Sequence, residues 1–303
     1  MEKKKIYVRE LISSFLSFYR SAEIDLTSVA VAYYLLISLF PIMMTLATIL
    51  PYLPINSQQI LAALEDFFPS RLYPSVSRLV TNLLTQPSNS LLGISIITTL
   101  WTISKSMTAL QKAVNKAYGV TEHRDFIIGH VVGILLGIGL QIMIFLSVTV
   151  LAFGQGVVQL IQNFIPLDNS VIVSLLHQSQ SVTYLALFFS LVMLYFFLPN
   201  IRVKKIRYAL PGALFVVVTI GTVGKFFAWY VESYASKLLD FRLATSVVFL
   251  VLILWFVFMA NVLIIGAILN ATIQSLQVDE FAVRDGDVVS ILNRIKGWFT
   301  PLD

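Results

Sequence analysis

One lysine inside a long apolar stretch has the residue type and position best suited to binding chemistry. Lys225 lies within residues 209–230, ALPGALFVVVTIGTVGKFFAWY, enough to cross the ~30 Å hydrocarbon core as a helix. An ammonium group there is costly unless it faces a wet cavity, a partner or the interface. Lys225 therefore either snorkels outward or pairs structurally, or it contacts an anionic headgroup or solute between helices. Glu232 follows on nearly the same helical face.

A stripe of small residues ends in a polar side chain in another apolar stretch. Gly129, Gly133 and Gly137 lie four residues apart, and Gln141 continues the same stripe. This spacing lets a neighbouring helix approach closely, and Gln141 can hydrogen-bond across the contact. A packing role accounts for all four residues, and a substrate contact is the alternative for Gln141.

Two asparagines occupy the last apolar stretch. Asn261 and Asn270 are of a type that forms helix-packing hydrogen bonds more often than ligand contacts. Their spacing puts them on opposite faces, so they are not expected to share a site. The candidate substrate-binding residues are Lys225, Glu232, Gln141 and Asn270.

Basic residues cluster in two polar segments between apolar stretches. Topology alone accounts for such clusters, because cytoplasmic loops are enriched in lysine and arginine. They also attract anionic lipid phosphates at about 1 kcal/mol per basic residue. The candidates for this headgroup attraction are Lys112, Lys116, Arg202, Lys204, Lys205 and Arg207.

Several chemistries lack the residues that they require. With no cysteine, the chain has no disulfide, thiolate metal site or cysteine nucleophile. No predicted span contains aspartate or glutamate, and the three histidines are not spaced as a metal-ligand set. No lysine and hydroxyl follow the glycine stripe as in a phosphate-binding loop. We therefore expect no enzymatic activity, no metal or other cofactor, no nucleic-acid partner and no direct ATP drive.

Composition assigns these residues to an all-α, polytopic membrane protein. Hydrophobic residues make up 57% of the chain and charged residues only 12%, against about 25% charged in soluble proteins. Pro41 lies inside the first apolar run and predicts a kink there. The six predicted spans are about 27–50, 91–108, 126–151, 182–198, 209–230 and 244–273.

Segments outside the predicted spans are amphipathic or charged. Residues 1–26 form a predicted cytoplasmic amphipathic segment, suited either to an anionic leaflet or to packing on the ends of the spans. Segments 54–90 and 152–181 offer apolar faces that either dock a periplasmic partner, with 54–90 the candidate, or cover the bundle. The tail, 274–303, is predicted to be cytoplasmic and too short for an independent domain. No removable signal peptide is expected.

The distribution of positive charge orients the predicted spans. Most of the 21 lysines and arginines lie before the first span, between spans two and three, between spans four and five, and in the tail. Six spans place these four segments on one side of the membrane. By the positive-inside rule, both termini are cytoplasmic.

Five short motifs follow one another along the chain: AYYLLISLFP at 32–41, AVNKAYGV at 113–120, LPN at 198–200, PGA at 211–213 and GAILNA at 266–271. Together they resemble the YihY/virulence factor BrkB family of bacterial inner-membrane proteins, some of which have carried a ribonuclease label. The resemblance implies six helices, the cytoplasmic membrane and a connection with serum resistance or lipid export. Ile268 stands where the family usually has an acidic residue. A mechanism that uses this carboxylate is therefore not expected here.

These observations favour an inner-membrane transporter or flippase-like protein that moves a lipid or other amphipathic anion. The expected partners are anionic membrane lipids. A structural or partner-binding scaffold of the cell envelope is the alternative, and a ribonuclease is a more remote one.

Overall fold

Every regular element that the computed structural model describes is a helix. The structure describes residues 2–52, 58, 61, 74, 77–78, 80–82, 88–120, 128, 131–139, 142, 179–238, 244–278 and 280–282. Within these ranges the side chains of residues 2–7, 46, 50, 179–183, 227–238 and 244–249 are not described. No strand occurs in the described part of the chain, so the predicted all-α class is confirmed for these residues.

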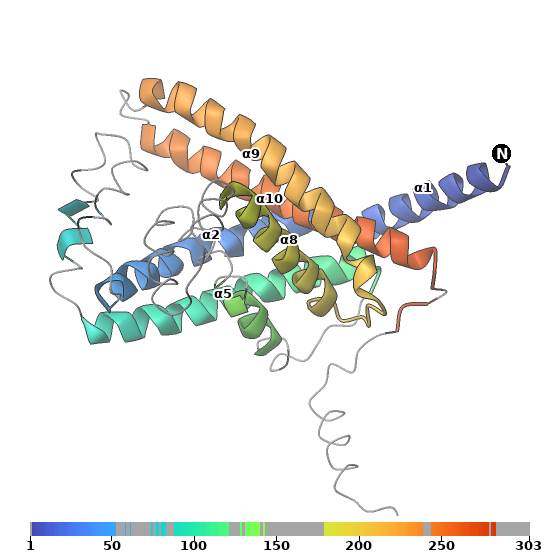
Figure 1. Ribbon diagram of the computed structural model, residues 1–303, viewed down its shortest axis with the longest axis horizontal. Helices are drawn as coiled ribbons and strands as arrows, with labels where there is room; N and C mark the ends of the chain where they lie inside the picture. The colour runs from blue at the N-terminus through green and yellow to red at the C-terminus, as the bar shows by residue number, and fades with distance from the viewer. Residues whose placement is uncertain are drawn as a thin grey trace, which may run out of the picture. The chain divides into compact units, whose positions relative to one another are not determined.

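Six α-helices and two short 3-10 helices follow one another along the described chain (Figure 1). The predicted third span, 126–151, is described only in pieces. Segments 54–90 and 152–181 and the tail lie largely outside the described residues. The elements are α1 (Glu2–Ala22), α2 (Ile24–Ile49), η1 (Leu50–Tyr52), α5 (Asn89–Ala117), α8 (Ser179–Phe197), η2 (Ile206–Tyr208), α9 (Leu210–Leu238) and α10 (Ala244–Ser275).

Local sequence explains where some helices begin and end. Pro211 is the second residue of α9, a position where the missing N–H costs no helical hydrogen bond. Helix α5 ends at Ala117, and two residues later Gly119 takes a left-handed φ of 68°. The amides of Gly119 and Val120 donate to the carbonyls of Lys116 and Asn115, as in a Schellman motif.

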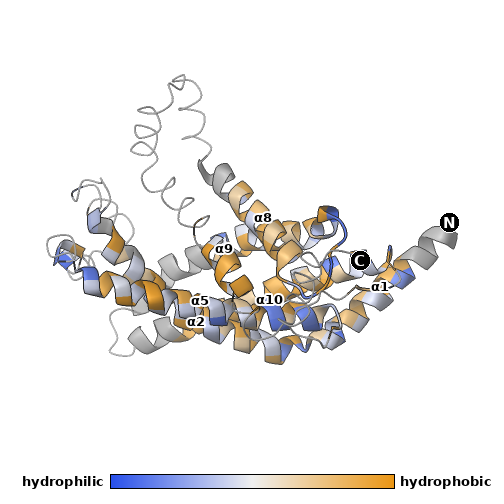
Figure 2. Ribbon diagram, turned by 90° about the horizontal axis from the view of Figure 1, so that it is seen from below, coloured by the Kyte–Doolittle hydropathy of each residue, from blue (hydrophilic) through white to orange (hydrophobic). Residues whose placement is uncertain are grey.

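Two described helices are long and apolar enough to cross a membrane, namely α2 and the part of α10 from Leu250 to Ser275. Two shorter apolar stretches are Tyr184–Phe197 in α8 and Leu210–Phe226 in α9. Figure 2 shows hydrophobic residues along α8, α9 and α10 and a mixture of both kinds along α1.

The chain divides into two compact units, each with its own packing. One unit comprises Met1–Leu36, Ile103–Gln141 and Tyr184–Asp303, and it contains the α9·α10 and α1·α10 contacts. The other comprises Ile37–Thr102 and Ile142–Thr183.

In the second unit, hydroxyl groups are buried and apolar side chains are exposed. Thr45 Oγ1 and Thr99 Oγ1 are hydrogen-bonded at 2.7 Å, and Thr48 Oγ1 and Ser95 Oγ are hydrogen-bonded at 3.1 Å. Phe40 is 70% exposed. Buried polar pairs and an apolar exterior are typical of helices that pack in lipid.

Candidate functional site

A turn between α8 and α9 is held in place by amide side chains of α5. Gln111 Nε2 donates to the carbonyl of Leu198 at 2.7 Å. Asn115 Oδ1 accepts from the backbone N–H of Asn200 at 2.8 Å. Because all four of these residues are buried, the two bonds fix the path of the chain as it leaves α8.

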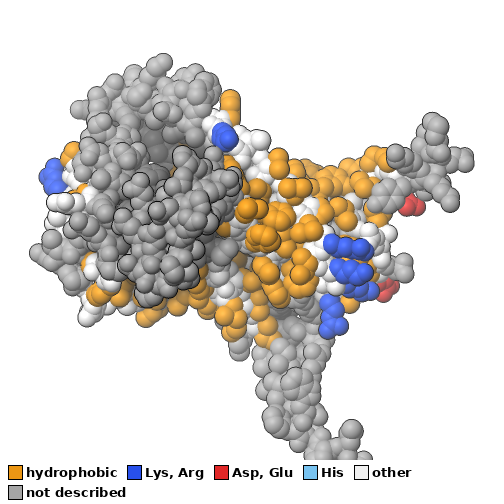
Figure 3. Space-filling model, viewed as in Figure 1, with side chains coloured by type: hydrophobic (Ala, Val, Ile, Leu, Met, Phe, Trp, Pro, Cys, Tyr) orange, Lys and Arg blue, Asp and Glu red, His pale blue; other side chains and the backbone are white. Residues whose placement is uncertain are grey.

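The same turn carries four exposed basic residues, which we call the basic turn: Arg202, Lys204, Lys205 and Arg207. Arg207 is oriented by its neighbours, since its Nη2 atom donates to Gln277 Oε1 at 2.7 Å and to the Tyr208 hydroxyl at 3.2 Å. Figure 3 shows lysine and arginine side chains gathered at the end of a broad hydrophobic face. The basic turn therefore presents a concentrated positive charge beside apolar surface.

An exposed stripe on α9 begins at the basic turn and reaches Lys225. Leu210 is 38% exposed, Leu214 56% and Val218 54%, and Phe226 extends the row. Lys225 is exposed too, and it makes no hydrogen bond or ion pair within the described part of the chain. At 1.5 Å per residue, the stripe from Leu210 to Lys225 is roughly 22 Å long. We call these five residues the α9 stripe.

Asn270 joins the start of α9 to α10. Its Oδ1 atom accepts from the Gly212 N–H at 2.7 Å. A Cβ on Gly212 would lie 2.7 Å from the Gly266 carbonyl carbon, and a Cβ on Gly266 would lie 3.0 Å from the Gly212 oxygen. The two helices thus cross with their backbones in contact, which explains why these glycines and Asn270 occur in the PGA and GAILNA motifs. Ile268, in the same GAILNA motif, is fully buried.

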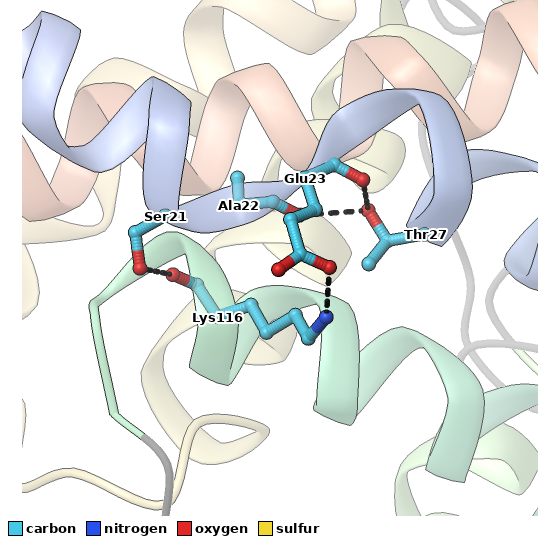
Figure 4. Close-up of polar contacts among 5 residues, drawn as sticks. All are labelled: Ser21, Ala22, Glu23, Thr27 and Lys116. Atoms are coloured by element: carbon cyan, nitrogen blue, oxygen red, sulfur yellow. Dashed lines mark hydrogen bonds and ion pairs between the residues drawn. The ribbon is translucent and has the colours of Figure 1, made fainter.

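Lys116 and Lys112, predicted to act alike, are in different environments. Lys112 is exposed, whereas Lys116 Nζ pairs with Glu23 Oε2 and the Lys116 carbonyl accepts from Ser21 Oγ at 2.9 Å. Figure 4 shows these contacts, together with Thr27 Oγ1 bonded to the carbonyls of Ala22 and Glu23. The Lys116 charge is already paired, so Lys112 is the residue of the two that is available to an anion.

The glycines of the predicted third span pack against α5 where they are described. A Cβ on Gly133 would lie 3.2 Å from the Ser104 carbonyl oxygen, and one on Gly137 would overlap the Ile103 side chain. Pro41 is buried inside α2. Gly129, Gln141 and the side chain of Glu232 lie outside the described residues, so the site is built without them.

Some buried polar atoms have no hydrogen-bond partner among the described residues. They include Asn270 Nδ2, Gln274 Oε1 and the Tyr118 hydroxyl. Tyr118 lies just beyond the end of α5, and burial raises the pKa of its hydroxyl above the ordinary 10.0. Within the described ranges, no three His, Cys, Asp or Glu residues are grouped closely enough to hold one metal ion.

Sequence reasoning missed Gln111 and the pairing of Lys116 with Glu23. Gln111 is one turn before Asn115 on the same buried face of α5, and two amides at this spacing in an otherwise apolar face are a usable signal. No local pattern marks Glu23 as the partner of a residue 93 positions away.

The comparisons with known proteins agree on one family. The profile of the family described as virulence factor BrkB matches residues 15–285. The chain is 28% identical over 265 residues to the ribonuclease-like protein YfkH of Bacillus subtilis (strain 168), covering 88% of this chain and 94% of that protein. No solved structure matches the chain.

Proposed function

The chain belongs to the virulence factor BrkB family, and from that premise we propose that this membrane protein moves a lipid or other amphipathic anion across or out of the bilayer. In this proposal six helices span the inner membrane, and both termini lie in the cytoplasm. The protein is a passive or ion-coupled carrier rather than an ATP-driven pump.

The observation that carries the proposal is the α9 stripe. Lys225 is exposed and has no ion-pair partner among the described side chains, so its ammonium group is accessible to an anion. The apolar residues Leu214 and Val218 lie between this cation and the basic turn. An acyl chain can rest on such a surface while its headgroup remains near positive charge.

The basic turn supplies the second element of the proposal. Lys204 and Lys205 are exposed a few residues before α9 begins, where a lipid phosphate would gain about 1 kcal/mol for each basic residue near the membrane surface. Headgroups would therefore be concentrated at one end of the stripe. Lys225 would then lower the cost of the charged group within the bilayer.

The test is headgroup accessibility of labelled anionic lipids in proteoliposomes. Intact protein should exchange them faster than empty vesicles do, and Lys225→Gln should slow exchange about fivefold or more, the equivalent of one lost lysine–phosphate interaction. Lys225→Arg is the matched control, because it keeps the charge at the same position. A labelled zwitterionic lipid should be affected less by Lys225→Gln.

The outcomes separate the alternatives. Exchange equal to that of empty vesicles, with folded protein, would reject transport and favour a scaffold of the cell envelope. Exchange that is fast but unchanged in Lys225→Gln would reject the assigned site. RNA cleavage by the purified protein, tested alongside because of the name of the Bacillus subtilis relative, would favour the enzymatic alternative.

A further inference from the structure

Helix α1 has two apolar faces with different surroundings. Leu11, Phe15 and Phe18 are half-buried and Ala22 is buried, which places them on the face that packs against the rest of the unit. The ring centroids of Phe18 and Phe281 are 5.9 Å apart, and α1 also contacts α10. This face is already covered by the protein itself.

The second apolar face of α1 is uncovered. Its residues recur every three or four positions and therefore form one stripe along the helix. Each of them is about half exposed: Val8 51%, Ile12 53%, Leu16 48% and Tyr19 43%. We call these four residues the α1 stripe.

Charge beside the α1 stripe indicates what covers it. Helical geometry places Arg9 and Arg20, both exposed, along the edge of the stripe, and Glu10 on the far side of the helix. The whole helix contains five basic residues and two acidic ones. Two copies of α1 facing each other would bring like charges together, whereas an anionic surface would pair with them.

Chain connectivity keeps α1 close to a membrane. It ends at Ala22, and α2, one of the two helices long enough to cross a bilayer, begins at Ile24. The Ser21 hydroxyl and the Glu23 carboxylate both bind Lys116 at the end of α5, which fixes this joint. A helix tied to a spanning helix by a single residue can meet the leaflet at which that span begins.

We propose that the α1 stripe docks into the anionic leaflet on the side where α2 begins, with Arg9 and Arg20 at the lipid phosphates. The helix then joins protein and lipid at once, with one face on the bundle and the other in the interface. This inference concerns a different helix from the α9 stripe and does not depend on transport.

The absence of native cysteine makes a direct test possible. Single variants Ile12→Cys and Leu16→Cys carry a fluorophore on the stripe, and Ser13→Cys and Ser17→Cys carry it on the exposed polar side. The full-length protein is reconstituted in vesicles of anionic lipid or of zwitterionic lipid alone. Quenching by lipid-attached nitroxide is compared with quenching by aqueous iodide.

Docking predicts that positions 12 and 16 are quenched mainly from the lipid and positions 13 and 17 mainly from water. In anionic vesicles, Arg9→Gln and Arg20→Gln should each lower the ratio of docked to undocked helix about fivefold. Equal iodide quenching at all four positions would overturn the proposal. So would strong dipolar coupling between spin labels at position 16 of different copies, since the stripe would then face a second chain.

Discussion

At the residue scale, Asn270 illustrates how one amide replaces a missing helix cap. Gly212 is the third residue of α9, and its N–H has no partner within its own helix. The Oδ1 atom of Asn270 supplies the acceptor from α10. An N-cap side chain normally comes from the residue just before the helix. Here α10 supplies the acceptor instead, and this hydrogen bond couples the start of α9 to α10.

Asn270→Ala should therefore destabilise the protein by about 1–3 kcal/mol, because a buried N–H loses its acceptor. Asn261→Ala is the matched control: Asn261 lies on the same helix, is only half-buried, and should change stability by less than about 0.5 kcal/mol. Thermal unfolding in lipid nanodiscs, followed by intrinsic tryptophan fluorescence, measures both. Equal losses in the two variants would show that the bond to Gly212 is not what stabilises the crossing.

The buried hydroxyl of Tyr118 predicts that the stability of the protein falls at high pH. Burial raises the pKa of this hydroxyl in the folded protein above the ordinary 10.0. Below pH 10 the hydroxyl is neutral in both states, so its titration does not affect stability. Above pH 10 only the unfolded state loses the proton, and stability falls with rising pH by up to about 1.4 kcal/mol per unit.

Tyr118→Phe should remove this loss. The hydroxyl has no hydrogen-bond partner among the described residues, so the substitution should be nearly neutral at pH 7. The variant should then unfold at a higher temperature than the intact protein at pH 11. Tyr33→Phe, at an exposed tyrosine, is the control and should not produce this difference. If the pH profile of Tyr118→Phe matched that of the intact protein, ionisation of Tyr118 would not limit alkaline stability.

At the element scale, sequence patterns predicted where helices occur better than they predicted which elements contact one another. Apolar runs indicated helices, and the described elements are all helical. Helix α5 continues beyond the apolar run that predicted its span, because the backbone bonds of a helix extend into polar sequence until a cap such as Gly119 ends it. Hydropathy indicates which part of a helix is suited to contact lipid, whereas the capping residues determine where the helix ends.

Contacts between elements could not be predicted from local patterns. Gln111 binds the carbonyl of Leu198, 87 residues away, and Asn115 binds the amide of Asn200, 85 residues away. The motif AVNKAYGV identified Asn115 only through resemblance to a family. For Lys225 the sequence allowed a snorkelling side chain, a structural pair or a contact with an anion. The structure describes an exposed side chain, and this exposure depends on how α9 packs against its neighbours, which the local sequence does not encode.

The α9·α10 crossing predicts that Gly212→Ala is strongly destabilising. The new Cβ would lie 2.6 Å from Asn270 Nδ2 and 2.7 Å from the Gly266 carbonyl carbon, so two backbones would have to separate. We expect the free energy of unfolding to fall by about 1–3 kcal/mol.

Gly93→Ala is the matched control, because Gly93 is also helical but a Cβ there would meet no atom within 4 Å. It should be neutral or slightly stabilising in thermal unfolding, because alanine favours helix. Similar losses in both variants would contradict a close crossing at Gly212.

At the scale of the whole molecule, the positions of the exposed basic residues along the chain and of the apolar helices fit one membrane topology. Lysines and arginines concentrate in segments that six spans would place on one side, and bonds from α5 fix the path of the chain into the basic turn. The same charges would satisfy the positive-inside rule and attract anionic headgroups. Topology is therefore the premise that the proposed transport and the proposed docking of α1 both share.

Single-cysteine labelling tests this topology in the otherwise cysteine-free chain. Lys112→Cys and Lys204→Cys replace exposed lysines of the two basic segments, and Ser90→Cys replaces an exposed serine near the start of α5. With both termini cytoplasmic, a membrane-impermeant maleimide should label Ser90→Cys in intact cells. It should label the two lysine positions only after permeabilisation, because charge holds these segments inside. A permeant maleimide, as the control, should label all three. Labelling of Lys204→Cys from outside would show that the basic turn lies on the outer side of the membrane. The positive charge would then face the outer leaflet and could not gather the headgroups proposed to reach Lys225 from the cytoplasmic side.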